Sequence, residues 1–281
     1  GKISIITSGI APIWDSDAQE WKTDADGDLV KEITSNPASW LLEVLTSDTH
    51  PASKVALDEI DLDAFGALYE LCEAQEWACD MVLTDGDTKQ NVLETICTTC
   101  HATMYRNING LISIVADWKT NNVCGIINEQ NCTSFSYERD NSRIADGVKA
   151  TYIDGDTYEE TSYIVMRDGS DSEERDTESV IKEVNLTGIT NYEHVVKMCR
   201  YVLAVEKLRP RTITAEVGKE GVFYTPLSIL QIQHPALKIG LGSAEVKALI
   251  TDSSGNITGL ELYDPIELTT TENYCIEMQC V

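Results

Sequence analysis

Residues 190–223 limit what this chain can fold into more than any other segment. Asn191 or Thr190 can cap a helix that extends to about residue 208, and the apolar side chains of this helix fall on one face. That face is formed by Val195, Met198, Cys199, Val202 and Leu203. A basic turn with a proline ends the helix, and residues 213–217 then alternate as a strand does. The segment therefore predicts a helix joined directly to a strand, within a mixed fold.

Three more helices are predicted in the first part of the chain. Asn36 can cap the first of them, which has a proline in its first turn. Asp61 or Asp63 starts the second, and its apolar residues share one face. Thr88 begins the third, which we expect to extend to about residue 102.

Two strand patterns lie among these helices. Residues 77–83 predict a strand, and residues 85–87 predict an Asp-Gly-Asp turn after it. Residues 104–106 and 111–115 flank an Asn-Gly pair, which is a strong signal for a hairpin. The predicted order of helix, helix, strand, helix and hairpin describes a compact α+β module.

Beyond residue 120 the chain is predicted to be mostly β. Residues 148–153 and 158–166 alternate on either side of a turn and predict a hairpin, and residues 180–186 predict a further strand. Residues 168–178 form an acidic loop that is poor in apolar residues. In the last roughly 60 residues, glycines interrupt short apolar runs, as in a small barrel or sandwich.

The charge of the chain restricts its partners. The formal net charge is −26 over 281 residues. A surface this acidic repels phosphate backbones, so we expect no specific nucleic-acid binding. No apolar run reaches the roughly 18 residues of a membrane helix, and no signal-peptide pattern is visible, so no membrane span is expected. The abrupt first and last residues predict an excised fragment of a longer protein.

Nine cysteines lie without the spacing of a disulfide framework. Several fall on the apolar faces of predicted helices, so we expect free, buried thiols in a reducing cytosol. The nine are Cys72, Cys79, Cys97, Cys100, Cys124, Cys132, Cys199, Cys275 and Cys280.

One cysteine pair matches a cofactor pattern. Residues 97–101, Cys-Thr-Thr-Cys-His, fit the C-x-x-C-H attachment pattern of c-type haem, with Met104, Met166 or Met198 as candidate distal ligands. The pattern lies inside a predicted amphipathic helix whose core face accounts for both cysteines, and covalent haem attachment needs an exported protein. Zinc would have at most three ligands there, and a redox CxxC would begin a helix. We therefore predict no haem, zinc or redox centre.

No other pattern specifies a catalytic, cofactor-binding or metal-binding residue. Asp24, Asp26 and Asp28 alternate as in a calcium loop, but Gly27 comes too early and no Glu closes the loop. The four histidines fit no nucleophile-elbow or zinc-protease pattern, and no phosphate-binding glycine loop is present. Carboxylates are too numerous for any pair to be singled out as catalytic.

A series of short segments, each weak alone, follows one collinear order over about residues 35–233. The segments are Asn-Pro-Ala-Ser-Trp at 36–40, Ile-Asp-Leu-Asp at 60–63, a helix at 91–102, a Tyr-to-Gly hairpin at 105–110, a strand ending in Asp at 111–117, Phe-Ser-Tyr at 135–137, Ser-Arg-Ile-Ala-Asp at 142–146, Tyr-Ile-Asp-Gly-Asp at 152–156, Leu-Thr-Gly-Ile-Thr at 186–190, Glu-Lys-Leu-Arg at 206–209 and Val-Gly-Lys-Glu-Gly at 217–221. This series resembles the phage tail tip proteins of the host-specificity (tip attachment) protein J family. The chain departs from the family where a Pro-Gly-Asp turn is usual, because Pro226-Leu227-Ser228 stands there.

The resemblance implies a baseplate hub protein without enzymatic activity. Its fold would be α+β, with β-barrel or sandwich hub domains and an inserted α+β module of three helices and a short sheet. The implied division is a remnant of an N-terminal hub segment at 1–34, the insertion module at 35–120, a β-rich hub domain at 121–233 with one long helix at about 190–208, and part of a small β-barrel at 234–281.

The resemblance also implies a role, partners and a location. Such a protein would be made in the bacterial cytoplasm from a phage or prophage, and would become a virion component at the tail tip. It would form a homotrimeric ring that closes the tail tube and supports tail assembly, host attachment and DNA passage. Its partners would be other tail proteins: the distal tail protein, the tape measure, and a fibre or spike.

Two other functions remain open at this point. A tail-associated cell-wall lytic enzyme is one, although no Cys-His or Glu-centred lytic motif is visible. A receptor-binding module is the other, although family members contact hosts mainly through a distal C-terminal region that we expect to lie outside this chain.

Overall fold

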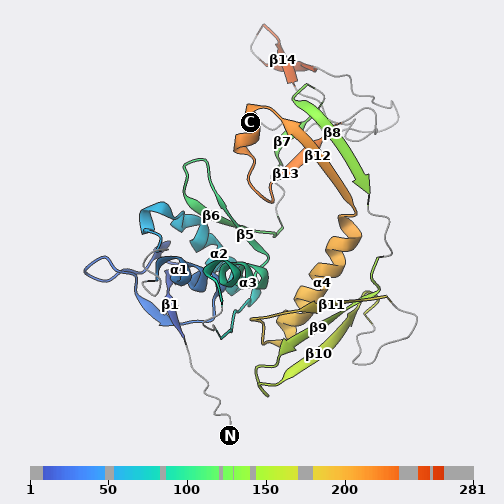
Figure 1. The fold of residues 1–281 in the computed structure, drawn as a ribbon. Helices are drawn as coiled ribbons and strands as arrows, with labels where there is room; N and C mark the ends of the chain where they lie inside the picture. Colours follow the sequence, from blue (N-terminus) through green and yellow to red (C-terminus); the bar gives the residue numbers. More distant parts are fainter. Residues whose placement is uncertain are drawn as a thin grey trace. The chain divides into compact units, whose positions relative to one another are not determined.

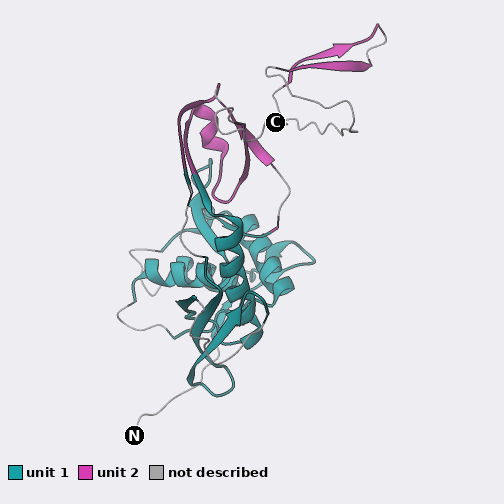
Figure 2. Ribbon diagram, turned by 90° about the vertical axis from the view of Figure 1, so that its right-hand side faces the viewer, with its two compact units in different colours: residues 1–118, 138–212 teal, residues 119–137, 213–281 magenta. Residues whose placement is uncertain are grey.

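The computed structural model describes residues 9–47, 54–82, 87–119, 123–128, 130–139, 144–169, 180–233, 246–253 and 256–262. These residues form an α+β fold that mixes helices with several small sheets (Figure 1). The chain divides into two compact units, Gly1–Trp118 with Glu138–Thr212, and Lys119–Tyr137 with Ile213–Val281 (Figure 2). Each unit is therefore assembled from two separate stretches of sequence. In the described residues, no helix is both long enough and apolar enough to cross a bilayer.

The first half of unit 1 packs helices against short hairpins. Its helices are α1 (Pro37–Thr46), η2 (Leu57–Glu59), α2 (Leu62–Gln75) and α3 (Lys89–Thr99). Its strands are β1 (Ile10–Pro12), β2 (Trp14–Asp15), β3 (Glu20–Trp21), β4 (Lys31–Ile33), β5 (Ala102–Arg106) and β6 (Ile112–Ala116). The antiparallel pairs are β1 with β4, β2 with β3, and β5 with β6.

The predicted helix starts are confirmed. Asn36 accepts a hydrogen bond from the Ala38 amide at the start of α1. Asp61 and Thr88 accept from the third residue after them at the starts of α2 and α3. These side chains satisfy amide groups that have no partner inside the helix, which fixes where each helix begins.

The strand predicted at 77–83 is wrong over residues 77–82, which are irregular. The Cys79 amide donates to the Ser35 carbonyl and the Asp80 amide donates to the Gly188 carbonyl, both at 2.8 Å. Because successive amides bond to two different segments, no ladder forms. Leu83 and most of the turn predicted at 85–87 lie outside the described residues.

The third helix ends earlier than predicted. It stops at Thr99, Cys100 is its C-cap, and His101 adopts a left-handed φ of 52° before β5 begins. The Cys-Thr-Thr-Cys-His sequence therefore spans the last helical turn and the following bend, and it does not lie inside the helix. The hairpin prediction is confirmed, since β5 and β6 pair around a turn in which Gly110 has a φ of 81°.

The residues that pack in this half form the first core. Two tryptophans from the N-terminal hairpin belong to it: the Trp14 and Trp21 rings meet edge to face at 5.6 Å, and the Trp21 indole donates to the Leu62 carbonyl. The first core consists of Trp14, Trp21, Ala38, Leu41, Leu42, Leu45, Ile60, Phe65, Leu68, Cys72, Trp77, Cys79, Val92, Leu93, Ile96, Cys97, Cys100 and Ile114.

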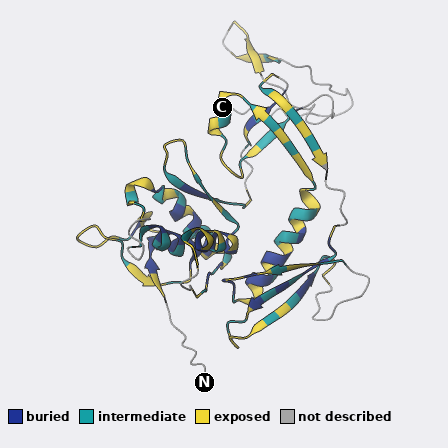
Figure 3. Ribbon diagram, in the orientation of Figure 1, coloured by how far each residue is buried: buried dark blue, intermediate teal, exposed yellow. Residues whose placement is uncertain are grey.

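The second half of unit 1 packs one long helix on a three-stranded sheet (Figure 3). The sheet has the order β10-β9-β11, with β9 (Gly147–Ile153) antiparallel to β10 (Glu160–Met166) and parallel to β11 (Ile181–Asn185). The helix is α4 (Tyr192–Leu208), and Asn191 caps it. The predicted hairpin, strand and long helix are confirmed. The second core consists of Ala145, Val148, Ala150, Tyr152, Val165, Leu186, Ile189, Val195, Met198, Cys199 and Leu203.

Unit 2 consists of paired strands and one short helix. It contains β7 (Val123–Ile127), η3 (Lys219–Phe223), β13 (Ile229–Ile232), β14 (Val246–Thr251) and β15 (Ile257–Leu262). It also contains most of β8 (Cys132–Arg139) and of β12 (Arg211–Val217), which cross the boundary between the units. The pairs are β8 with β12, β7 with β13 in parallel, and β14 with β15 antiparallel. Within the described ranges these strands close no barrel.

Candidate functional site

The two cores of unit 1 meet at a joint of polar and aromatic side chains, which we call the junction. From the first half it contains Trp77, Cys79, Asp80, Thr99, His101, Asp117 and Trp118; from the second half it contains Gly188, Thr190, His194, Lys197, Tyr201 and Arg209. The second-half residues come from α4 or from the residues that flank it, so the amphipathic helix carries one side of the joint.

Asp117 is the most highly connected residue of the junction. It lies just after β6, and Arg209, just after α4, holds its carboxylate with two parallel hydrogen bonds of 2.5 and 2.8 Å. The Tyr201 hydroxyl donates to the same carboxylate at 2.5 Å. The Arg209 hydrogen bonds, with help from Tyr201, lower the pKa of Asp117. A bidentate pair of this kind fixes the distance and the orientation between the arginine and the carboxylate, so it ties the end of β6 to the end of α4. We call this contact between Asp117 and Arg209 the clasp.

The Tyr201 phenol is correspondingly hard to ionise. Burial and the negative charge of Asp117 raise the pKa of Tyr201 to about 12. The hydroxyl therefore stays a donor across the physiological range. It is an unfavourable general base or nucleophile, and the arrangement suits a mechanical contact.

His101 joins the clasp to an aromatic stack. Its ring lies 3.7 Å from the Tyr201 ring, centroid to centroid, and meets Trp77 edge to face at 5.4 Å. Trp77 in turn meets Trp118 edge to face at 5.5 Å. Burial, and then the nearby His194, lower the pKa of His101 to about 4. The ring is therefore neutral near pH 7 and acts as an aromatic packing surface.

His194 connects α4 to the end of α3. Its side chain is 2% exposed, and its Nε2 lies 2.9 Å from the Thr99 carbonyl oxygen. Because a carbonyl can only accept, Nε2 carries the proton. Nδ1 is buried and has no hydrogen-bond partner within the described part of the chain. Burial lowers the pKa of His194 to about 4, so this residue too is neutral near pH 7.

Asp80 ties the irregular segment after α2 to the turn before α4. Its carboxylate accepts from the hydroxyls of Ser35 at 2.6 Å and Thr190 at 3.0 Å. Its amide donates to the carbonyl of Gly188, which has a φ of 87°. A side chain at Gly188 would also press on Cys79 Sγ at 3.3 Å, so the turn requires glycine for two reasons.

The cysteines in and beside the junction do not fit a haem site. Cys97 and Cys100 are buried in the first core, while His101 is held in the aromatic stack. Burial raises the pKa of Cys79 and of Cys97 to about 12, and a hydrogen bond with Cys72, together with burial, raises that of Cys100. Protonated, buried thiols are poor nucleophiles and poor metal ligands.

The other ligand candidates are likewise engaged elsewhere. Met198 packs in the second core and Met104 lies partly buried against the first. Asp24 uses its carboxylate to accept the Asp26 and Asp28 amides within its own turn. Over the ranges that the structure describes, no three His, Cys, Asp or Glu side chains are arranged to hold a metal ion.

Inspection of the sequence did not identify the junction. It singled out no role for Asp117, Tyr201, Arg209, His194 or Asp80. A signal was present, because Asp117 ends one segment of the collinear series and Arg209 ends another. Nothing in a single sequence, however, reveals that two segments 92 residues apart meet.

Comparison with known proteins finds likeness at the level of structure alone. No protein-family model matches the chain, and no curated protein matches it. A tail protein from Neisseria meningitidis MC58 aligns with a TM-score of 0.41 and 16% identity, over 58% of this chain and 50% of that one. A chain in the virion of a native gene transfer agent particle aligns with a TM-score of 0.45 and 12% identity, over 64% of this chain and 37% of that one.

A third structure gives a similar result. The 43 kDa tail protein of prophage MuSo2 from Shewanella oneidensis aligns with a TM-score of 0.35 and 10% identity, over 57% of this chain and 47% of that one. The chain thus spans half or less of each solved chain that it resembles. These structures are tail proteins and a virion component. Because their TM-scores lie below 0.5, the function has to be argued from the residues of this chain.

Proposed function

We propose that this chain is a structural part of a phage or prophage tail tip, in the baseplate hub. The observation that carries the proposal is the clasp between Asp117 and Arg209. These residues end two of the segments by which the sequence resembles tail tip proteins. Their pairing in space supports the series as the framework of one folded unit, and chance matches scattered along the chain would not be expected to meet in this way.

The chemistry of the junction supports a mechanical role. Its histidines are neutral, its phenol is protonated and its carboxylate is held by an arginine. Catalysis would require a nucleophile or base with a pKa near the working pH and access to a substrate. A joint whose donors and acceptors are mutually engaged, apart from the buried Nδ1 of His194, is instead suited to keep two halves of a unit in register under load.

The proposal includes an assembly. In the tail tip, this chain would belong to a homotrimeric hub that closes the tail tube and supports tail assembly, host attachment and DNA passage. Its partners would be the distal tail protein, the tape measure and a fibre or spike. The division into hub segments, insertion module and barrel part also belongs to this proposal. The net charge of −26 would reduce sticking of DNA if acidic residues line the tube.

Genetic complementation tests the proposal. Deleting the gene should give particles with absent or incomplete tails, and the wild-type gene should restore them. Arg209→Glu should fail to restore tails, because it places two like charges together. Arg211→Glu makes the same change of charge two residues away and should succeed. A deletion strain that makes normal, infectious tails would refute the structural role.

The charge swap Asp117→Arg with Arg209→Asp separates a broken joint from simple unfolding. It restores opposite charges at the same positions, so it should recover tail formation at least in part. A cell-wall lysis assay on the purified chain decides against the enzymatic alternative if lysis is absent. Lysis that persists in repeated preparations would favour a lytic enzyme instead.

A further inference from the structure

Unit 2 buries few apolar side chains. The first and the second core both consist of residues of unit 1. Within the described part of unit 2, Ile127 is the one hydrophobic side chain that is buried. Paired strands with so little apolar area removed from water are only marginally stable by themselves. Unit 2 therefore gains stability wherever its exposed apolar side chains are covered by another surface.

Several of these exposed side chains lie close together in the sequence, at the end of η3 and in the turn that follows it. Val222 is 63% exposed and Phe223 is 70% exposed, and Leu227 and Ile229 are exposed as well. We call these four residues the neutral patch. Hydrogen bonds from the Tyr224 amide to the Gly221 carbonyl and from the Ser228 amide to the Thr225 carbonyl keep this part of the chain compact.

The patch belongs to the longest stretch of the chain without an acidic or basic side chain. Residues 221–237 contain no Asp, Glu, Lys or Arg, in a chain whose formal net charge is −26. A basic partner would bind such a chain through its acidic surface, where opposite charges attract. An acidic partner is repelled by that surface and can approach closely only where charge is absent. The uncharged apolar segment therefore fits a partner that is itself acidic.

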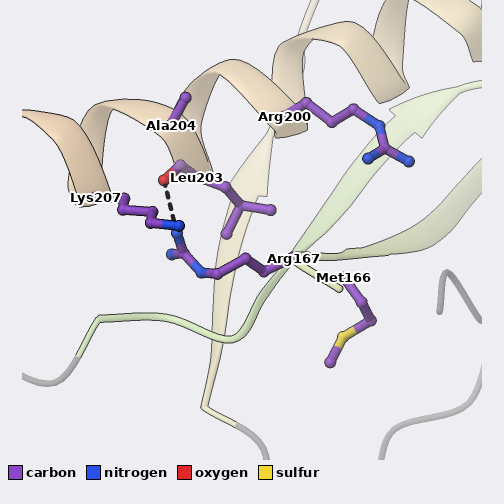
Figure 4. Close-up of a pocket in the computed structure, with 6 residues that line it drawn as sticks. All are labelled: Met166, Arg167, Arg200, Leu203, Ala204 and Lys207. Atoms are coloured by element: carbon purple, nitrogen blue, oxygen red, sulfur yellow. Dashed lines mark hydrogen bonds between the residues drawn. The ribbon is translucent and has the colours of Figure 1, made fainter. Parts of the chain in front are cut away.

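A charged surface of unit 1 provides the contrast. Figure 4 shows a hollow between β10 and α4 that is lined by Met166, Arg167, Arg200, Leu203, Ala204 and Lys207. Arg167 already donates to the Ala145 and Leu203 carbonyls, and its charge helps to lower the pKa of Glu206 beside it. A contact made through charged side chains of this kind would weaken as salt rises, whereas a contact through uncharged side chains would not.

A second copy of the chain is an acidic partner, because it carries the same net charge of −26. We propose that copies of this chain associate through the neutral patch, which removes Val222 and Phe223 from water and adds to the small buried apolar area of unit 2. The proposal rests on the homotrimeric assembly proposed above, for which it names the contact surface.

Analytical ultracentrifugation of the purified chain tests the proposal. The chain should associate as its concentration rises from about 1 to about 100 μM. Association should strengthen as salt rises from about 50 to about 500 mM, because screening reduces the repulsion between acidic copies. A chain that stays monomeric at about 100 μM over this range of salt, or that dissociates as salt rises, would overturn the proposal.

Paired variants locate the contact. Val222→Ser with Phe223→Ser should weaken association at least about tenfold, since two apolar side chains no longer gain from burial. Ile10→Ser with Ile33→Ser removes two similarly exposed side chains, which face each other across β1 and β4, and should leave association unchanged. Both pairs should keep the circular dichroism of the wild type, because all four side chains are exposed. Equal weakening in the two pairs, or none in the first, would contradict the assignment.

A failure of this proposal can be told from a failure of the proposed function. A monomeric chain, together with absent tails in the deletion strain, would contradict the contact surface alone. Association that depends on Val222 and Phe223, together with normal tails in the deletion strain, would contradict the tail-tip role alone.

Discussion

At the scale of single residues, the junction depends on one carboxylate. Asp117 accepts from Tyr201 and from both ends of the Arg209 guanidinium, and its side chain is only 14% exposed. A charge that is partly removed from water needs all of its partners, because its hydration has been given up. Among the acidic residues of unit 1, substitution of Asp117 should therefore cause the largest loss of stability, and substitution of the others should cause much less.

The Asp117→Asn variant should lower the free energy of unfolding by about 2 kcal/mol, since it weakens charge-assisted hydrogen bonds to two partners. Tyr201→Phe removes one of those bonds and should lower it by about 1 kcal/mol. Urea unfolding at pH 7 measures both. Asp26→Asn, in an exposed turn, is the matched control and should change stability by less than about 0.5 kcal/mol. Equal losses of stability in Asp26→Asn and Asp117→Asn would contradict a special role for the clasp.

A second prediction at the residue scale concerns the loss of stability at acidic pH. The folded pKa of His194 is about 4 and its ordinary value is 6.5. Above pH 6.5 both folded and unfolded chains leave this ring neutral, so its contribution to stability is complete. Between pH 6.5 and 4 only the unfolded chain takes up the proton, and stability falls by on the order of 2–3 kcal/mol. Below pH 4 this group causes no further loss.

His194→Gln tests that assignment, because its amide can still donate to the Thr99 carbonyl and does not titrate. The variant should lose less stability than the wild type when urea midpoints are compared from pH 7 to pH 4.5. It should keep part of the dependence, since His101 also has a pKa near 4. Identical pH profiles for the two proteins would show that His194 titrates normally in the folded state.

At the scale of elements, caps and turns explain both what the sequence predicted and what it did not. The helix starts were predictable, because a cap is a local interaction that neighbouring residues determine. The caps found are Asn36, Asp61, Thr88 and Asn191. The segment at 77–83 was predicted to form a strand. Its amides pair with Ser35 and Gly188, and no local pattern encodes such distant partners.

The same distinction applies to the site. The apolar face of α4 was predictable from helical spacing. The residues that α4 contributes to the junction were not, since the partners of His194 and Tyr201 lie 95 and 84 residues away. Likewise, Trp14 and Trp21 belong to the first core, although they precede the helices that were predicted in this part of the chain.

Asn36 should matter more than an ordinary cap. Besides capping α1, its Nδ2 donates to the Tyr69 carbonyl at 3.1 Å and to the Glu73 carboxylate at 2.9 Å, which ties α1 to α2. Asn36→Ala should lower the free energy of unfolding by about 2–3 kcal/mol, because buried partners lose their donor as well. Thr88→Ala, which removes a cap alone, should cost about 1 kcal/mol. Thermal and urea unfolding distinguish these values. Equal losses of stability in the two variants would contradict the proposed link between α1 and α2 through Asn36.

The turn at 226–228 supplies a stabilising prediction. Leu227 has a φ of 62°, and it occupies the position where the resembled family has glycine. A left-handed conformation strains a residue with a Cβ by about 1 kcal/mol, which glycine avoids. Leu227→Gly should therefore raise the unfolding temperature of unit 2 slightly, although the neighbouring Ser228→Gly, at a negative φ, should not. A clear loss of stability in Leu227→Gly would mean that its side chain contributes more than its backbone costs.

At the scale of the whole molecule, the chain combines a firmly joined unit with a strongly acidic surface. Two cores held by a clasp, an aromatic stack and buried hydrogen bonds form unit 1, and paired strands form unit 2. In the junction both histidines are neutral near pH 7, and the Tyr201 phenol stays protonated. These properties agree with the structural role proposed above.

Immunogold electron microscopy tests that central claim most directly. Particles induced from the bacterial strain that carries the gene would be labelled with antibody raised against residues 9–118 and 144–212. The tail-tip proposal predicts gold at the end of the tail distant from the head, with no label on particles from a deletion strain. Gold confined to the head or the tail shaft, or intact particles that contain none of this chain by mass spectrometry, would contradict it.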